Sequence, residues 1–405
     1  MQTFLSRQMM ETSDGREANR ILRSCVHCGF CTATCPTYRL LGDELDSPRG
    51  RIYLIKGLLE GEDISTRTRT HLDRCLTCRA CETYCPSGVE YGHLLDIGRQ
   101  HLEQARPRSL PDRIYRYLLR RFLASKSLFS LALATGQILR PVLPGKLQKK
   151  IPVRPVSCST RDPGNHPRHT ILFRGCVQAS LSPQTNLATV SVLDRLGITA
   201  IECEQDNCCG AIDYHMSDIE HARKCIRKNI DAWWPLVEQG AEAIVITASG
   251  CGAMIKEYAY IMKEDADYAD KAEKISRLAK DLSEIPGEND IDTLRSLIRG
   301  RSGNVVFQSP CTLQHGQKLS GKVESLLERI GIPLLPIRDG HLCCGSAGVY
   351  SIMQRQLSEQ LRQEKIRHLL ATNPEVILTA NIGCQIHLQQ STDVPVMHWV
   401  EYINR

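Results

Sequence analysis

Two copies of one cysteine pattern constrain this chain more than any other feature. Residues 25–36 read CVHCGFCTATCP and residues 75–86 read CLTCRACETYCP. Both copies have the spacing C-x2-C-x2-C-x3-C-P, in which three closely spaced thiolates bind one iron–sulfur cube and the fourth turns away to bind the other cube of a pair. The spacing therefore predicts two [4Fe–4S] clusters with crossed ligation. The expected ligand sets are Cys25, Cys28, Cys31 and Cys85 for one cluster, and Cys75, Cys78, Cys81 and Cys35 for the other.

Disulfide bonds and zinc are the alternative uses of such cysteines. Disulfide frameworks are typical of short secreted chains, whereas this chain has 405 residues and begins without the apolar stretch of a signal peptide. Zinc would need only two C-x2-C pairs, and here each motif supplies a third and a fourth cysteine. We therefore expect iron–sulfur sites in a cytoplasmic protein.

The composition is that of a folded protein with room for two or three domains. Hydrophobic residues make up 42% of the chain and charged residues 24%. The longest apolar stretch, residues 127–139, is shorter than the roughly 20 residues that cross a bilayer, so we expect no transmembrane helix. Nineteen cysteines in an intracellular chain indicate metal or redox chemistry.

Positive charge is concentrated in residues 106–155, where twelve Lys or Arg residues accompany one acid, Asp112. Residues 111–126 have apolar side chains near helical spacing, and four prolines follow from Pro141 onward. We expect a basic amphipathic helix and a linker over residues 106–168. Such a helix can lie on an anionic membrane surface, or it can pack on a neighbouring domain or a partner subunit with its arginines in solvent; we favour packing. We expect no nucleic-acid binding, because aromatic residues make up only 5% of the chain and no nucleic-acid motif occurs.

Residues 1–105 have the pattern of a helical module around the two cysteine motifs. Ser47 and Pro48 are residue types that favour the N-cap and first turn of a helix, and apolar residues recur from there to residue 59. A second helical pattern covers residues 89–104. We therefore expect an α-helical ferredoxin-like domain that holds two [4Fe–4S] clusters.

An internal repeat follows the basic segment. Each copy contains a single cysteine, then thirty-one residues, then a Cys-Cys-Gly triplet, and finally another single cysteine. The eight repeated cysteines are Cys176, Cys208, Cys209 and Cys251 in the first copy, and Cys311, Cys343, Cys344 and Cys384 in the second. The equal gaps rule out a casual resemblance between the two copies.

Strand and helix patterns alternate around these cysteines in the same order in both copies. Buried strand patterns at 171–173 and 305–308 run into the loops of the first cysteines, and helices that end at glycine follow. The alternation predicts two α/β CCG units with mainly parallel sheets, over residues 169–300 and 301–405, with the cysteine loops at the strand ends. The whole chain is expected to have an α+β multidomain fold.

Three roles are open for the repeated cysteines. Four soft sulfur ligands per unit could bind an additional iron–sulfur cluster, two of them could form a redox thiol pair, or all could be inert buried residues. We favour a metal or redox role for the repeated eight. We favour an inert role for Cys158, Cys203 and Cys225, which have no counterparts in the other copy.

Several segments together resemble a known family. The doubled cysteine motif, the segments LLGDELDSPRGRIYLIK and TASGCGA, and the two CCG units cover nearly the whole chain. They resemble the family of CCG-domain iron–sulfur subunits that includes the iron–sulfur subunit of bacterial glycolate oxidase. The CCG units of heterodisulfide reductase end in CxxC, whereas Cys251 and Cys384 stand singly, so we do not expect a noncubane cluster or disulfide reduction. We assign no role to His215, His315 and His387, which lie near the cysteine motifs.

The resemblance implies a division of labour within an oxidoreductase complex. Flavin subunits containing FAD would oxidise glycolate, a 2-hydroxy acid, and this chain would pass the electrons to a membrane quinone. The chain would be cytoplasmic, either free or in peripheral contact with the cytoplasmic face of the inner membrane. The chain itself is expected to have no catalytic residue, and it contains no G-x-G-x-x-G dinucleotide motif. The alternatives are a reductase subunit of the heterodisulfide reductase type, or the iron–sulfur subunit of a lactate or glycerol-3-phosphate dehydrogenase.

Overall fold

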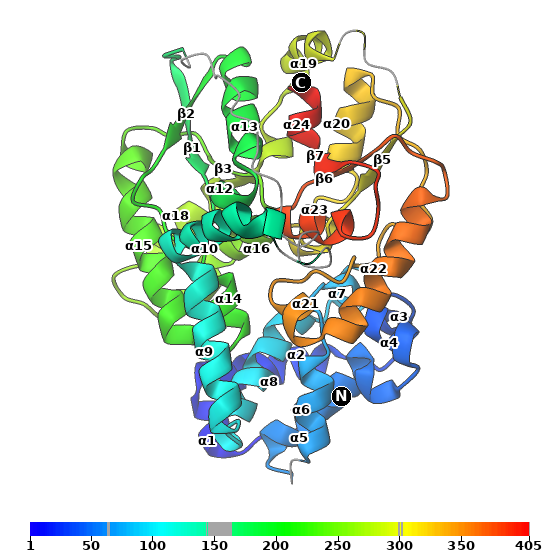
Figure 1. Ribbon diagram of the computed structural model, residues 1–405. Helices are drawn as coiled ribbons and strands as arrows, with labels where there is room; N and C mark the ends of the chain where they lie inside the picture. Colours follow the sequence, from blue (N-terminus) through cyan, green and yellow to red (C-terminus); the bar gives the residue numbers. More distant parts are fainter. Residues whose placement is uncertain (63–64, 143, 145–163, 299, 301–302, 405) are drawn as a thin grey trace.

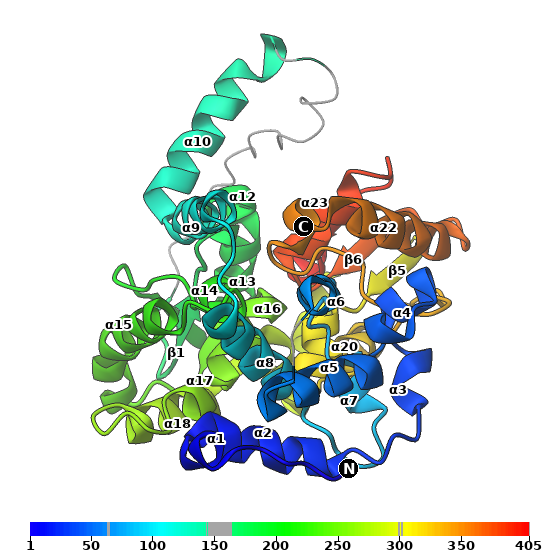
Figure 2. The same ribbon diagram turned by 90° about the horizontal axis from the view of Figure 1, so that it is seen from below.

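A helical N-terminal module lies against two α/β units in the computed structural model of this chain, which describes residues 1–62, 65–142, 144, 164–298, 300 and 303–404 (Figure 1). Figure 2 shows the module lying against both units. The expected α+β multidomain architecture is confirmed. Cys158 and most of the expected linker fall outside the described residues.

The N-terminal module consists of helices packed around a small apolar core that includes cysteines of both motifs. Its elements are α1 (Arg7–Glu11), α2 (Ser13–Ser24), α3 (Phe30–Ala33), α4 (Pro36–Leu41), η1 (Glu44–Asp46), α5 (Pro48–Glu60), α6 (Thr66–Asp73), α7 (Ala80–Thr83) and α8 (Tyr91–Ala105). Ser47 caps α5 by accepting a hydrogen bond from the amide of Gly50, as the sequence predicts. Helices α5 and α8 approach closely because Gly98 has no Cβ; an added Cβ would lie 2.7 Å from Ile55.

The first CCG unit contains a four-stranded parallel sheet in the order β2-β1-β3-β4. Its elements are β1 (Arg168–Phe173), α12 (Gln178–Leu181), α13 (Pro183–Arg195), β2 (Ile198–Glu202), α14 (Ala211–His215), α15 (Ile219–Glu238), β3 (Ile244–Ile246), α16 (Ser249–Lys256), α17 (Tyr258–Ile261), α18 (Ala269–Leu278), β4 (Ala279–Asp281), η3 (Leu282–Glu284), η4 (Glu288–Asp290) and α19 (Ile291–Leu297).

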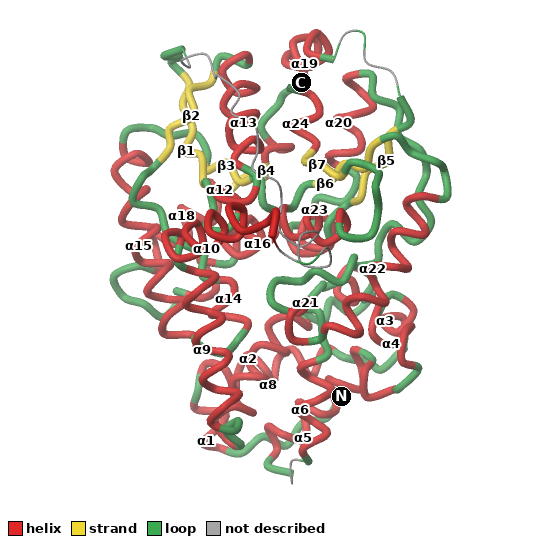
Figure 3. The backbone as a smooth tube through the Cα atoms, viewed as in Figure 1, coloured by secondary structure: helices red, strands yellow, loops and turns green. Residues whose placement is uncertain are grey.

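The second CCG unit repeats this topology with one strand reduced to a single bridge. Its parallel sheet has the order β5-β6-β7, and an isolated parallel bridge between Val305 and Leu334 takes the place that β2 has in the first unit. The elements are β5 (Val305–Gln308), η5 (Thr312–Gly316), α20 (Lys322–Ile330), α21 (Tyr350–Met353), α22 (Arg355–Leu370), β6 (Val376–Thr379), α23 (Ile382–Gln389), β7 (Val396–His398) and α24 (Trp399–Ile403). Figure 3 shows the two small sheets in yellow, surrounded by helices.

The two CCG units share one hydrophobic core. Leu193 from α13 of the first unit belongs to the same cluster of buried side chains as Leu327 from α20 and Trp399 from α24 of the second. Because apolar burial supplies most of the driving force for folding, this arrangement ties the two units into one body.

The basic segment forms two helices, where the sequence predicted one followed by a linker. Helix α9 (Leu110–Ala124) and helix α10 (Lys126–Leu139, continued by η2, Arg140–Val142) meet at an angle of 88°. Ser125 produces the break because its side chain caps α10 by accepting from the amide of Leu128. No single helix in the described part of the chain is long and apolar enough to cross a membrane, although this bent pair meets the criteria of length and composition when its two helices are taken together.

Helix α9 packs on the body of the protein, as expected, but it does so through ion pairs of arginines that were expected to lie in solvent. Arg116 lies 3.6 Å from Asp73 of the N-terminal module, and Arg120 lies 2.9 Å from Asp218 of the first CCG unit. Helix α9 therefore connects the module to that unit. Figure 2 shows α10 projecting away from both.

His398 joins the two CCG units at a buried contact. The ring Nε2 lies 3.0 Å from the carbonyl oxygen of Thr247 in the first unit, and Nδ1 accepts a hydrogen bond from the amide of Val400. Burial disfavours the charged ring and lowers the pKa of His398 to about 4.

We predict that this contact weakens in acid. The unfolded chain protonates this histidine near its ordinary pKa of about 6.5, whereas the native chain does not, so His398 lowers the free energy of unfolding by about 2 kcal/mol between pH 6.5 and pH 5. Urea denaturation across this range measures the change, and the variant His398→Gln should show a shallower pH dependence. Equal slopes for the two proteins would contradict the prediction.

Candidate metal centres

The cysteine loops of the N-terminal module turn sharply at corresponding positions. His27 and Gly29 in the first motif have φ angles of 55° and 84°, and Thr77 and Arg79 in the second have φ angles of 55° and 60°. These left-handed residues alternate with the cysteines, so each loop coils back on itself. Alternation of this kind produces a concave arrangement of backbone N–H groups, which is typical of anion and iron–sulfur sites.

The first expected ligand set lines one cavity. Its members are Cys25, Cys28, Cys31 and Cys85. Burial raises the pKa of Cys31 to about 11, and negative charge on the nearby Cys25 and Cys85 adds to the rise. The structure thus brings together thiols from both motifs, in the grouping that crossed spacing predicts; ligation itself stays a prediction.

The second expected set lines the adjoining cavity together with Arg51 and Tyr91. Its members are Cys35, Cys75, Cys78 and Cys81. Cys81 also lines the first cavity, so the two groups are neighbours. The Tyr91 hydroxyl donates to the Cys75 sulfur at 3.6 Å. Hydrogen bonds to sulfur are one of the means by which a protein sets the potential of an iron–sulfur cluster.

Arg51 is a buried charge that the sequence analysis did not identify. Its side chain is 1% exposed, and its guanidinium donates to Asp46 at 3.2 Å, to Thr37 at 3.1 Å and to the Cys35 sulfur at 3.9 Å. Negative charge on Cys75, Cys35 and Asp46 outweighs the effect of burial and raises the pKa of Arg51.

The position of Arg51 in its helix is the signal that could have identified it. Arg51 precedes Ile55 and Leu58 by four and seven residues, and therefore lies on the buried face of α5. An arginine on an otherwise apolar helix face indicates a buried partner of opposite charge.

Each CCG unit brings its four repeated cysteines to one point at the carboxyl ends of its strands. In the first unit the sulfur atoms of Cys176 and Cys208 lie 3.6 Å apart, and Cys209 hydrogen-bonds Cys251. Hydrogen bonds donated to Cys208, together with burial, raise the pKa of Cys176 and Cys209, and the same hydrogen bonds lower the pKa of Cys208.

The second unit repeats this arrangement. The sulfur atoms of Cys311 and Cys343 lie 3.7 Å apart, and those of Cys344 and Cys384 lie 3.4 Å apart. All four cysteines are buried. Four thiols from three separate segments of the chain form a donor set that fits a soft metal or an iron–sulfur cluster.

The three histidines to which we assigned no role lie in short helices, and each has a hydrogen-bonding partner. His215 lies 3.1 Å from Asp96, and His315 lies 2.9 Å from the Thr83 hydroxyl, so both connect a CCG unit to the N-terminal module. His387 lies 3.3 Å from Ser358.

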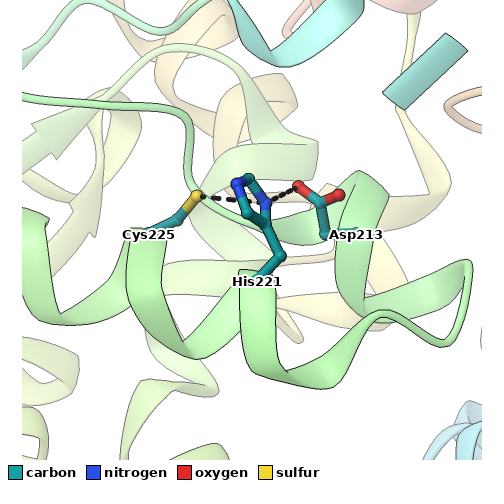
Figure 4. A group of neighbouring side chains, drawn as sticks. All are labelled: Asp213, His221 and Cys225. Atoms are coloured by element: carbon teal, nitrogen blue, oxygen red, sulfur yellow. Dashed lines mark hydrogen bonds and ion pairs between the residues drawn. The ribbon is translucent and has the colours of Figure 1, made fainter. Parts of the chain in front are cut away.

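Asp213, His221 and Cys225 form a further group of metal-ligand residue types beside the first repeated site (Figure 4). His221 Nδ1 lies 3.0 Å from Asp213 and 3.9 Å from the Cys225 sulfur, while Arg121 of α9 donates to the other ring nitrogen. A neutral ring that accepts at Nε2 carries its proton on Nδ1, which therefore has no lone pair for a metal. We interpret this group as a hydrogen-bonded link between α15 and α9.

Comparison with known proteins agrees with this geometry. A family model described as "4Fe-4S dicluster domain" matches residues 21–89, and a model described as "Cysteine-rich domain" matches residues 170–256 and 305–389. The chain is 52% identical over 405 residues to the "Glycolate oxidase iron-sulfur subunit" of Escherichia coli (strain K12), with all of this chain and 99% of that protein covered.

More distant relatives share the same plan. Identity is 31% over 401 residues with the "Probable glycolate oxidase iron-sulfur subunit" of Bacillus subtilis (strain 168), covering 91% of this chain and 88% of that protein. It is 28% over 244 residues with "Lactate utilization protein A" of Geobacillus thermodenitrificans (strain NG80-2), covering 58% of this chain and 97% of that protein.

The fold and the cysteine sites define an iron–sulfur electron-transfer protein with a dicluster module and two cysteine-rich repeats. Within that class, the identity over its full length shows that the chain belongs to the family of glycolate oxidase iron–sulfur subunits.

We predict that Arg51 raises the reduction potential of the cluster that the second set is expected to bind. A positive charge favours the added electron, so Arg51→Gln should shift that potential in the negative direction by on the order of 100 mV. Redox titration followed by electron paramagnetic resonance measures the shift. Arg51→Lys should retain most of the potential, and Lys56→Gln, on the same helix but outside both cavities, should leave it unchanged. An unaltered potential in Arg51→Gln would refute this role.

Proposed function

We propose that this chain carries electrons from flavin-containing subunits, which oxidise a 2-hydroxy acid such as glycolate, to a membrane quinone. The adjoining cysteine groups of the N-terminal module, which share the side chain of Cys81, are the observation that carries the proposal. Neighbouring clusters divide the two electrons of a flavin into single steps. Glycolate is proposed as the substrate because it appears in the names of relatives that match all or nearly all of the chain.

The eight cysteines of the N-terminal module are the proposed cluster ligands, in the crossed sets given above. An iron–sulfur cluster supplies one-electron transfer when it is bound. The residues of the chain hold the sulfur atoms, exclude water and donate hydrogen bonds to them, as the amide of Thr77 does to Cys75 at 3.5 Å and the amide of Val89 does to Cys85 at 3.5 Å. No residue of the chain is proposed to act on the organic substrate, and FAD is proposed to reside in the partner subunits.

We predict selective loss of one cluster in the variant Cys28→Ser. The two motifs together should bind about eight iron atoms. The variant should lose roughly half of them, together with one reduced-cluster signal, because serine is a poor ligand for a soft site. Iron analysis and electron paramagnetic resonance of anaerobically purified complex measure both effects. Cys203→Ser, which changes an unrepeated cysteine, is the matched control.

The activity of the complex distinguishes the electron carrier from a scaffold. Cys28→Ser should abolish quinone reduction while glycolate oxidation with an artificial acceptor continues. Quinone reduction at the normal rate in a variant that lacks the cluster would overturn the proposed electron path.

We also propose that helices α9 and α10 rest on the membrane that holds the quinone, at its cytoplasmic face. The ion pairs of Arg116 and Arg120 turn the charged side of α9 toward the protein, so its apolar side chains face outward. Neither helix contains a buried residue. The exposed large apolar side chains of the pair are Leu110, Ile114, Tyr115, Tyr117, Leu118, Phe122, Leu128, Leu131, Ile138, Leu139 and Val142. Asp112 is the one acid among residues 106–155, so the surrounding charge complements an anionic lipid surface.

We predict that the double variant Leu131→Asp/Ile138→Asp binds anionic vesicles at least tenfold more weakly. These side chains are 67% and 77% exposed, so the changes remove apolar contact with lipid and leave the folded core intact. Vesicle flotation measures the binding, and Phe4→Asp, at an equally exposed apolar position of the N-terminal module, should bind normally. Normal vesicle binding with loss of the flavin subunits would instead assign this surface to a partner protein.

A further inference from the structure

A cavity lies where the N-terminal module meets both CCG units, and we call it the junction cavity. It is lined by Cys78 and His93 of the module, by His215 and Tyr260 of the first CCG unit, and by Thr312 of the second. Cys78 also lines the cavity of the second expected cluster set. A ligand in the junction cavity would therefore be separated from that cluster by a single cysteine side chain.

The junction cavity adjoins a large cleft between the module and the first CCG unit. The cleft has a volume of about 650 Å³ and shares Tyr214 and Tyr260 with the junction cavity. Small-molecule sites typically occupy about 300–1,000 Å³. The junction cavity itself has a volume of about 60 Å³, so a substituted ring would extend from it into the cleft. Asp218, which pairs with Arg120 of α9, also lines the cleft, so the cleft lies beside the inner side of that helix.

Two histidines line the junction cavity, and each is paired with a carboxylate through one ring nitrogen. Nε2 of His93 donates to Glu257 at 2.8 Å, and Nδ1 of His215 donates to Asp96 at 3.1 Å. The other nitrogen of each ring has no hydrogen-bond partner among the described residues. A carboxylate fixes the proton of the nitrogen that it contacts, so the second proton of each ring is gained and lost at the free nitrogen.

The ring of His93 is held in place on both sides of this contact. It stacks on Tyr260 with the ring centroids 3.8 Å apart and the planes within 3° of each other. Burial lowers the pKa of His93, but the hydrogen bond and the negative charge of Glu257 outweigh burial and raise it. The protonated ring has an N–H group at Nδ1 that is free to donate. His93 is 12% exposed and His215 is 41% exposed, so His93 lies deeper.

The charged side chains of the junction cavity are already paired with one another. Arg79 donates to Glu257 at 2.6 Å, and the same carboxylate pairs with His93. Asp96 pairs with His215. A cavity with paired charges favours a neutral ligand over an ion. Two free histidine nitrogens favour a ligand with two acceptor atoms, and the position beside a proposed cluster favours one that accepts electrons.

We propose that the junction cavity binds the headgroup of a quinone, with His93 and His215 donating hydrogen bonds to its two carbonyl oxygens. The inference rests on the proposed electron-transfer function and adds the place where the acceptor binds. Two electrons arrive one at a time from the cluster of the Cys75 set, which is oxidised at each step and reduced again by the flavin subunits.

The two histidines supply the protons of this reduction. One proton moves from Nδ1 of His93 and one from Nε2 of His215, so that both C=O groups become C–O–H groups and a quinol leaves. Water in the cleft returns one proton to each ring.

Direct binding tests the assignment of the site. The anaerobically purified complex should bind a benzoquinone with a short side chain, as measured by equilibrium dialysis. His93→Leu and His215→Leu should each weaken binding by roughly tenfold or more, because each removes a donor to a carbonyl oxygen. His101→Leu, which changes a histidine of α8 outside both spaces, should bind normally. Normal binding in both variants of the cavity would overturn the assignment.

A conservative variant tests the transfer of the proton from His93. Asparagine places an amide N–H near the position of Nδ1 but has no proton to release. His93→Asn should therefore bind the quinone nearly as well as the wild-type protein and reduce it roughly tenfold more slowly or less, so that kcat falls while KM changes little. A normal kcat would refute this role of His93.

A variant of the cavity wall tests the site without changing a histidine. Gly250 of α16 lines the junction cavity, and an added Cβ would lie no closer than 3.8 Å to its nearest neighbour, Asn381. Gly250→Leu should fill the cavity and weaken quinone binding even if a histidine variant does not fold. Normal binding in folded Gly250→Leu would contradict the proposal.

The results also separate this inference from the proposed function. A complex that reduces quinone while every variant of the junction cavity binds it normally would overturn the inference alone. A complex whose N-terminal clusters are absent, or are not reduced by glycolate, would overturn the electron-transfer function itself.

Discussion

Clustering of buried sulfur atoms is the constraint on which the rest of this structure depends. Thiolates lose their hydration when they are buried together, and each one disfavours charge on its neighbours, so a folded chain must compensate them with cations, hydrogen bonds or metal. Arg51 supplies a cation beside Cys35, and Tyr91 donates a hydrogen bond to Cys75. The surrounding helices are arranged so that these groups meet the sulfur atoms from several directions.

Helix α9 shows how strongly charge can decide the orientation of an element. An amphipathic helix on a protein surface ordinarily faces its apolar side inward. Here the acids of two neighbouring bodies, Asp73 and Asp218, hold the arginines of α9 inward, and the apolar side faces outward. The helix thus connects the module with the first CCG unit and leaves an apolar surface exposed.

Much of the architecture could be predicted from the sequence because its signals are local. Cysteine spacing indicates the two N-terminal groups, equal gaps indicate the repeat, and Ser47 with Pro48 indicates the start of α5. The break at Ser125 was missed because an apolar run that is too short to span a membrane does not reveal a second helix. Arg51 was missed because its partners, such as Cys35 and the carbonyl oxygen of His71, are distant in sequence, and only the folded chain brings them together.

The core shared by the two CCG units has a further consequence. Rates of electron tunnelling fall exponentially with the distance between donor and acceptor, so even small domain motions would make transfer intermittent. Leu193, Leu327 and Trp399 lock the units into one body, and Tyr350 anchors the second unit to the backbone of the N-terminal module. Side-chain packing therefore fixes the distance from the cysteine groups of the N-terminal module to the second CCG site.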